Sequence, residues 1–243
     1  MSDAKNQPSS PSDAVSKSDE ESLIQVRRDK AAKIRERGAH PFANDVARDE
    51  RIFIGDLRRK FDVAMGEDGQ YQAEAVDANA AGERFTVFGR LIARRGFGKA
   101  SFLRLRDGSG EIQLFAKKDI LGEDFAALKE IDLADHIEAK GRAMLTKTGE
   151  LSLELSHLRL VTKSLRPPAD KWHGLADVDL RYRRRYVDMV ANPEVAQVIA
   201  ARAIVLGAIR KYLDQRHFLE VETPSLHPLI GGASARPFAT HHN

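Results

Sequence analysis

The chain has 243 residues, enough for one large or two modest domains that each bury a hydrophobic core. Its 39 basic and 36 acidic residues leave a net charge of only +3, so nucleic-acid binding can be argued only from local clusters of cations. The absence of cysteine excludes disulfides and thiolate metal sites and favours a reducing compartment. No apolar run reaches membrane-spanning length and the N-terminus lacks a signal-peptide core, so we expect a cytoplasmic protein without membrane contact.

The N-terminal region is polar and then strongly basic. Residues 1–20 have almost nothing to bury and are predicted to be a disordered tail. A helix is predicted from about Asp19 to the stop signal at Gly38, and its many cations indicate either a solvated charged face or an arm that contacts phosphates. Residues 21–83 form this helical arm and a loop, with a second short helix around Asp56–Phe61.

Residues 84–162 have a different pattern. They contain five strand candidates with alternating apolar and polar residues, separated by Asp-Gly-Ser-Gly and Thr-Gly turns. A helix candidate, EDFAALKEI, lies between the third and fourth strands. This order is typical of a five-stranded OB-fold barrel, although another small β-barrel fits the pattern as well.

An OB barrel binds single-stranded nucleic acid through aromatic rings and a basic groove. A ring at Phe102 could stack on a base, and the Gln113 amide, eleven positions later past a tight turn, could read a base edge. The cations Arg94, Arg95 and Lys99 could hold phosphates. The alternatives are that Phe102 is a core aromatic and that Gln113 is an ordinary exposed strand residue.

A linker and a long helix follow the predicted barrel. Pro167 and Pro168 break regular structure within a predicted linker over residues 163–192. Residues 193–217 carry apolar residues at helical spacing, and a strand is predicted over Phe218–Glu222.

Four segments together resemble bacterial-type lysyl-tRNA synthetases, which are class II synthetases of the aspartate, asparagine and lysine subgroup. The segments are RGFGKASFLRLRDGSGEIQLF, ADKWHGLADVDLRYRRRYVDM, HFLEVETP and GGASARPFATHHN. The resemblance covers residues 20–243 and implies an α+β protein. The protein implied by the resemblance has a basic N-terminal helix, an OB-fold anticodon-binding barrel and, over residues 193–243, the start of an antiparallel α/β catalytic domain.

The resemblance also implies roles for single residues. Phe102 and Gln113 match the stacking and base-reading residues of the anticodon-binding barrel, and Arg94 matches an arginine close to the anticodon. The dimer-forming motif 1 would include Phe218, Glu220 and Pro224, and a lysine-binding loop would be formed by Gly232 with its neighbours Gly231 and Ala233. Where the family usually has glycine before the motif 1 phenylalanine, this chain has His217.

The family's motifs 2 and 3, whose arginines hold the phosphates of ATP, have no counterpart in the chain. We therefore expect no catalytic or metal-ligating residues here, and no lysine activation by this chain alone. The hypotheses are the N-terminal part of a homodimeric lysine–tRNA ligase, which uses ATP, Mg²⁺, lysine and tRNA-Lys, or a free-standing tRNA-binding module. A third is a paralogue that lysylates a protein or a lipid, but the barrel and the lack of membrane spans count against it.

Overall fold

The structure, a computed structural model, describes residues 17–43, 45–46, 50–168, 175–224 and 238–241. The chain divides into two compact units, Met1–Pro168 and Ala169–Asn243. The predicted tail lies outside the described residues except for residues 17–20, which already belong to the first helix.

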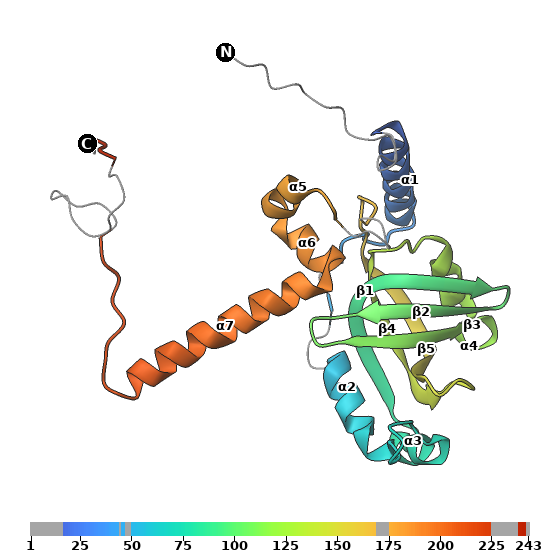
Figure 1. Cartoon of the computed structure of the whole chain (residues 1–243). Helices are drawn as coiled ribbons and strands as arrows, with labels where there is room; N and C mark the ends of the chain where they lie inside the picture. Colours follow the sequence, from blue (N-terminus) through green and yellow to red (C-terminus); the bar gives the residue numbers. More distant parts are fainter. Residues whose placement is uncertain (1–16, 44, 47–49, 169–174, 225–237, 242–243) are drawn as a thin grey trace, which may run out of the picture. The chain divides into compact units, whose positions relative to one another are not determined.

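The first unit contains the predicted barrel and several helices. Its elements are α1 (Lys17–Glu36), α2 (Ile54–Phe61), the 3-10 turn η1 (Asp62–Ala64), α3 (Ala73–Ala80), β1 (Arg84–Phe97), β2 (Ala100–Arg106), β3 (Glu111–Lys117), α4 (Lys118–Leu121), the 3-10 segment η2 (Gly122–Lys129), β4 (His136–Leu145) and β5 (Leu151–Thr162) (Figure 1). The five predicted strands are confirmed, and the helix expected between the third and fourth is formed by α4 and η2. The segment read as a loop before β1 instead contains α3.

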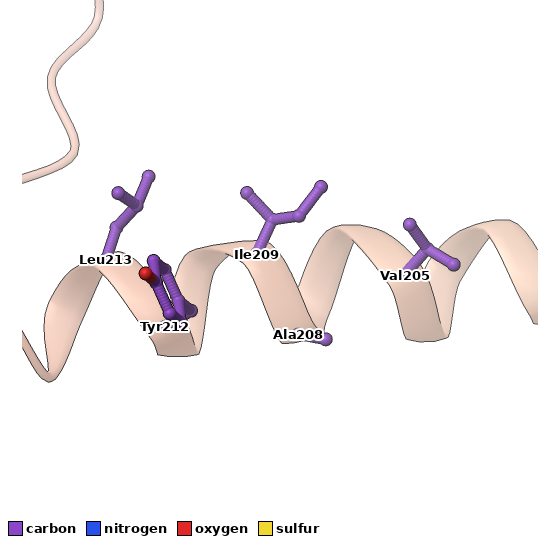
Figure 2. Close-up of a pocket in the computed structure, with 5 residues that line it drawn as sticks. All are labelled: Val205, Ala208, Ile209, Tyr212 and Leu213. Atoms are coloured by element: carbon purple, nitrogen blue, oxygen red, sulfur yellow. The ribbon is translucent and has the colours of Figure 1, made fainter.

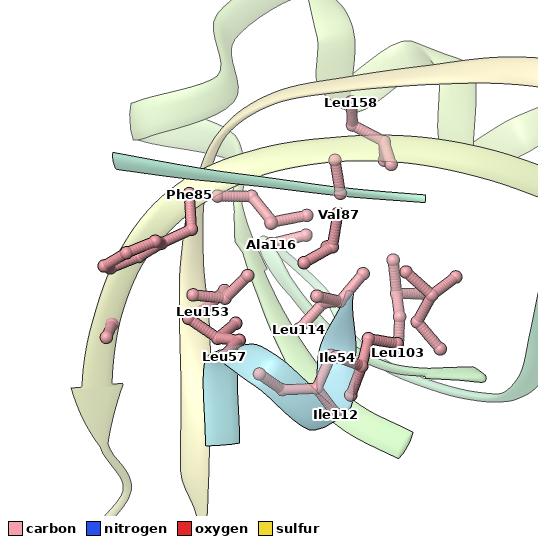
Figure 3. Packing of buried hydrophobic residues seen from close by; sticks show 14 of the residues in the cluster. Ile54, Leu57, Phe85, Val87, Leu103, Ile112, Leu114, Ala116, Leu153 and Leu158 are labelled. Atoms are coloured by element: carbon pink, nitrogen blue, oxygen red, sulfur yellow. The ribbon is translucent and has the colours of Figure 1, made fainter. Parts of the chain in front are cut away.

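The five strands close into a barrel in the order β1-β2-β3-β5-β4. All pairs are antiparallel except β3–β5, which is parallel and closes the barrel. Inward residues alternate with outward ones, and side chains such as Val87, Leu114 and Leu153 fill the centre with no exposed surface (Figure 3). A closed five-stranded barrel with this strand order is the OB architecture.

Helix α2 packs into the same core. Ile54, Leu57 and Phe61 are fully buried on one face of α2 and belong to the barrel's hydrophobic cluster (Figure 3). The residue before the helix, Phe53, has no side chain that could cap it. The β2–β3 turn supplies the cap, because the amide of Ile54 donates to the Asp107 carboxylate at 2.8 Å.

The basic helix α1 is held on the first unit by ion pairs and by a small apolar contact. Ala31 and Ile34 are buried, while Lys30 pairs with Asp132 at 2.6 Å. The Arg27 guanidinium donates to the backbone carbonyl of Ser164 at 2.8 Å. Part of its charge therefore serves docking to the barrel.

A fully buried lysine lies next to this docking site. The Lys163 ammonium donates to Asp132 at 2.5 Å, to Asp135 at 2.7 Å and to the Glu130 carbonyl at 2.7 Å. Partial burial would raise the pKa of Asp132, but hydrogen bonds from Lys163 and Lys30 outweigh it and hold that pKa below its ordinary value. The cluster ties the loop before β4 to the end of β5.

The regular structure described in the second unit is helical. Its helices are α5 (Val178–Arg183), α6 (Arg185–Ala191) and α7 (Pro193–Asp214), and the first two lie within the predicted linker. The predicted strand over Phe218–Glu222 is wrong, because these residues form no ladder with any described strand. His217 adopts φ of 62°, the left-handed conformation in which glycine would carry no strain.

None of the described helices alone is long and apolar enough to cross a membrane. Helices α6 and α7 pass the length and composition test only as a pair, which is bent by 115°.

We predict that Gly141→Ala destabilises the barrel by about 1–3 kcal/mol, because overpacking forces backbone shifts. A Cβ at Gly141 would lie 2.4 Å from the Glu154 carbonyl oxygen across the β4–β5 ladder. The control is Gly96→Ala on β1, whose Cβ would meet Ser101 Oγ at an ordinary 3.5 Å. Hydrogen–deuterium exchange of the strands in increasing urea measures the difference, and equal stability of the two variants would contradict the prediction.

We also predict that Lys163→Met lowers the free energy of unfolding by about 3–5 kcal/mol, because the buried Asp135 carboxylate then lacks its counter-charge. Lys118→Met, at an exposed lysine of α4, is the control and should leave stability within about 0.5 kcal/mol of the wild type. Thermal unfolding followed by circular dichroism compares the two. A Lys163→Met variant as stable as the control would show that the cluster contributes nothing to stability.

Candidate nucleic-acid interface

The outer face of the barrel carries the two residues that the sequence singled out. Strand register places Arg95, Phe102, Phe115 and Glu154 in one row across β1, β2, β3 and β5. Gln113 lies two positions before Phe115 on β3, so it shares this face and is a diagonal neighbour of Phe102. Because β2 alternates between half-buried and buried residues and Phe102 is half-buried, the alternative that Phe102 is a core residue is wrong.

Phe102 is part of a group of three phenylalanines. Its ring stacks on Phe115 with a centroid separation of 4.7 Å and an interplanar angle of 19°. Phe97 approaches Phe102 edge-on at 6.3 Å, and the ammonium of Lys117 lies 5.2 Å from the centroid of the Phe115 ring. Sequence reasoning missed Phe97 and Phe115, although the period-two alternation from Gln113 leads directly to Phe115.

The Gln113 amide is held in one orientation. Its Nε2 donates to Ser152 Oγ at 3.1 Å, and Ser152 Oγ in turn donates to the Glu150 carbonyl at 3.2 Å. None of the described residues donates a hydrogen bond to Gln113 Oε1. The amide therefore presents an acceptor oxygen on the half-buried outer face of β3.

Two neighbouring arginines lie on opposite faces of β1. Arg95 pairs in register with Phe102, whereas Arg94 pairs with Leu103, whose side chain is buried. A bulge between Leu91 and Ala93 shifts the register and reverses the alternation beyond it. The resemblance assigned the anticodon-proximal position to Arg94, but the structure brings Arg95 onto the face of Phe102.

Arg94 has a different set of contacts. Its guanidinium donates to the backbone carbonyls of Leu128 and Ile131, at the C-terminal end of η2. A cation suits this position because the last carbonyls of a helical segment lack intrahelical partners. The Arg94 side chain is therefore engaged within the barrel unit.

The remaining cations divide into free and paired ones. Arg95 and Lys99 are exposed, and no hydrogen bond or ion pair links their side chains to another described residue. Lys117 instead pairs with Glu154 at 3.6 Å, and Arg104 pairs with Glu150 at 3.3 Å. Within the described part of this face, Arg95 and Lys99 are thus the cations that remain available for phosphates.

The other predicted site residues belong to the second unit. Gly231, Gly232 and Ala233 lie outside the described residues, while Phe218, Glu220 and Pro224 are exposed. The Glu220 carboxylate pairs with Arg210 of α7 at 3.0 Å.

Helix α7 also carries an apolar stripe. Its side chains line a shallow pocket on successive turns (Figure 2), formed by Val205, Ala208, Ile209, Tyr212 and Leu213. All five residues are exposed in the chain as described.

Metal binding finds little support in the described residues. No group of three or more His, Asp or Glu side chains among them is arranged to hold an ion.

Comparisons with known proteins match both parts of the chain. The family model described as an OB-fold nucleic acid binding domain (tRNA anti-codon) matches residues 85–161, and the model for class II tRNA synthetases (D, K and N) matches residues 177–243.

Individual relatives extend this match over nearly the whole chain. A lysine–tRNA ligase of Xanthomonas campestris pv. campestris (strain 8004) is 48% identical over 93% of this chain and 43% of its own length. The lysine–tRNA ligase of Xylella fastidiosa (strain 9a5c) is 46% identical over the same shares, and that of Halalkalibacterium halodurans is 41% identical over 91% of this chain and 42% of its own. The chain thus spans less than half the length of these relatives. By these matches, the chain is similar to class II tRNA synthetases of the aspartate, asparagine and lysine group, and over nearly all of its length it is similar to the lysine–tRNA ligases.

Proposed function

We propose that this chain acts in lysine–tRNA ligation and that its barrel binds the anticodon of tRNA-Lys. The observation that carries the proposal is the outward placement of Phe102 and Gln113 on one face of a closed OB barrel. The similarity to lysine–tRNA ligases indicates tRNA-Lys as the RNA that is bound. OB barrels bind single-stranded nucleic acid by stacking aromatic rings on bases and by holding phosphates with cations.

The lysine anticodon is rich in uracil, and the face suits that base. The ring of Phe102 offers one side for stacking, since Phe115 covers the other. Uracil presents an N3–H donor on its Watson–Crick edge, which the free Oε1 of Gln113 can accept. Arg95 and Lys99 supply positive charge for the phosphates on either side of the flipped base.

The remaining parts of the proposal rest on the longer relatives. Lysine and ATP with Mg²⁺ would be the substrates and cofactors of the complete ligase in the cytoplasm, and Gly231, Gly232 and Ala233 would lie against the bound lysine. A homodimer would form through motif 1, and the exposed apolar stripe of α7, together with Phe218 and Pro224, supports that assignment.

We predict that Phe102→Ala weakens binding of a lysine anticodon stem-loop by about 1–3 kcal/mol, because the base loses its stacking partner. A stem-loop with the same stem and a purine-rich loop triplet should be affected less. The comparison variant is Lys99→Ala, which should weaken both RNAs alike and flatten the salt dependence of binding. Filter-binding titration measures all four affinities, and an unchanged affinity of Phe102→Ala for the lysine stem-loop would reject the proposed role.

The two arginines should separate stability from RNA binding. We expect Arg94→Ala to cost about 1 kcal/mol of stability and to speed amide exchange in residues 122–131, because the Leu128 carbonyl loses its donor. Arg95→Ala should leave that exchange unchanged and weaken binding of the stem-loop. Hydrogen–deuterium exchange mass spectrometry and RNA titration on both variants test these roles. Faster amide exchange in Arg95→Ala together with weaker RNA binding in Arg94→Ala would contradict them.

A further inference from the structure

Phe97 is an aromatic residue to which the proposed recognition assigns no role. It ends β1, the residue is 64% exposed, and the centroids of its ring and the Phe102 ring lie 6.3 Å apart in an edge-on arrangement. Register places it opposite Ala100, the small residue that precedes Phe102 by two positions on the same face. The ring therefore stands at the rim of the Phe102–Phe115 stack with most of its surface open to solvent.

The position of Phe97 is fixed by its backbone. A two-residue turn, Gly98 and Lys99, joins β1 to β2, and Gly98 takes φ of 60°, which glycine adopts without strain. The turn is anchored to the neighbouring strand end because the amide of Lys118 donates to the Lys99 carbonyl at 2.9 Å. Because this backbone is already ordered, it loses little conformational freedom when Phe97 binds a ligand.

The charge around Phe97 indicates which ligand its ring would take. Arg95 lies two residues before Phe97 on the same face and Lys99 lies in the turn, and neither side chain is paired with another described residue. An exposed ring between two free cations matches the pattern of single-stranded nucleic-acid binding, in which rings stack on bases and cations hold the phosphates between them. It does not match an apolar protein partner, for which unpaired cations at the centre of the contact would be unfavourable.

We propose that Phe97 is a second stacking platform, which takes the loop base adjacent to the one stacked on Phe102. The two rings are inclined by 74°, so a single base cannot lie flat on both. Two successive bases, splayed apart at the phosphate that Arg95 and Lys99 face, can each stack on one ring. The inference rests on the proposed anticodon binding and adds a second contacted base to it.

The test uses the whole chain and a stem-loop RNA with a UUU loop triplet, together with three versions in which one nucleotide of the triplet is replaced by an abasic nucleotide. Phe97→Ala should lower affinity for the intact stem-loop by roughly fivefold to a hundredfold, the range for loss of one base–aromatic stack. Phe97→Trp should retain the affinity. Phe53→Ala, at another half-exposed phenylalanine of the same unit that precedes α2, is the matched control and should have no effect.

The abasic RNAs decide between one contacted base and two. The effect of Phe97→Ala should vanish with the abasic nucleotide at one position of the triplet, and the effect of Phe102→Ala should vanish with it at the adjacent position. If both effects vanish at the same position, the two rings contact one base and the inference is overturned. If only Phe102→Ala weakens binding, the inference fails while anticodon binding stands, and if neither does, both fail.

Discussion

The Asp107 carboxylate fixes two parts of the barrel unit at once. It accepts hydrogen bonds from the amides of Ser109 and Gly110, which shape the β2–β3 turn, and from the amide of Ile54, which begins α2. The turn sets the register of the hairpin, and a shift of one residue would move Phe102 and Gln113 from the outer face into the core. The outer face that carries Phe102 and Gln113 therefore depends on a carboxylate that lies on neither strand and contacts no base in the proposed function.

The barrel could be predicted because the sequence signals for its strands and turns are local. Alternation along each strand and glycine-containing turns indicate the same five elements that the structure forms. Helix α3 could not be predicted in this way, because its eight residues lie among glycines, and its stability comes from burying Val76 and Ala80 against the barrel. The failed strand over Phe218–Glu222 shows the converse. A strand-like composition forms a strand only where a partner supplies the other half of the ladder.

The candidate site could be predicted from the sequence to the level of residue type but not always of position. A cation near Phe102 follows from the sequence, but the choice between Arg94 and Arg95 depends on a single bulge. Leu91 is buried, so uninterrupted alternation would point Arg94 outward, and the extra residue at Ile92 reverses the two. The position of a bulge is difficult to predict from amino-acid composition, since it depends on how the whole strand pairs with its neighbour.

The docking of α1 has a consequence for the order of events on the ribosome. Lys30 meets Asp132 across 102 positions of sequence, and Arg27 meets Ser164 across 137. Most of the stability of a helix in a protein comes from tertiary packing, and α1 leaves the exit tunnel long before the residues that it packs against are synthesised. Helix α1 is thus synthesised well before the residues that it docks against, and until β5 is complete its basic surface remains exposed to the RNA-rich environment of its own synthesis.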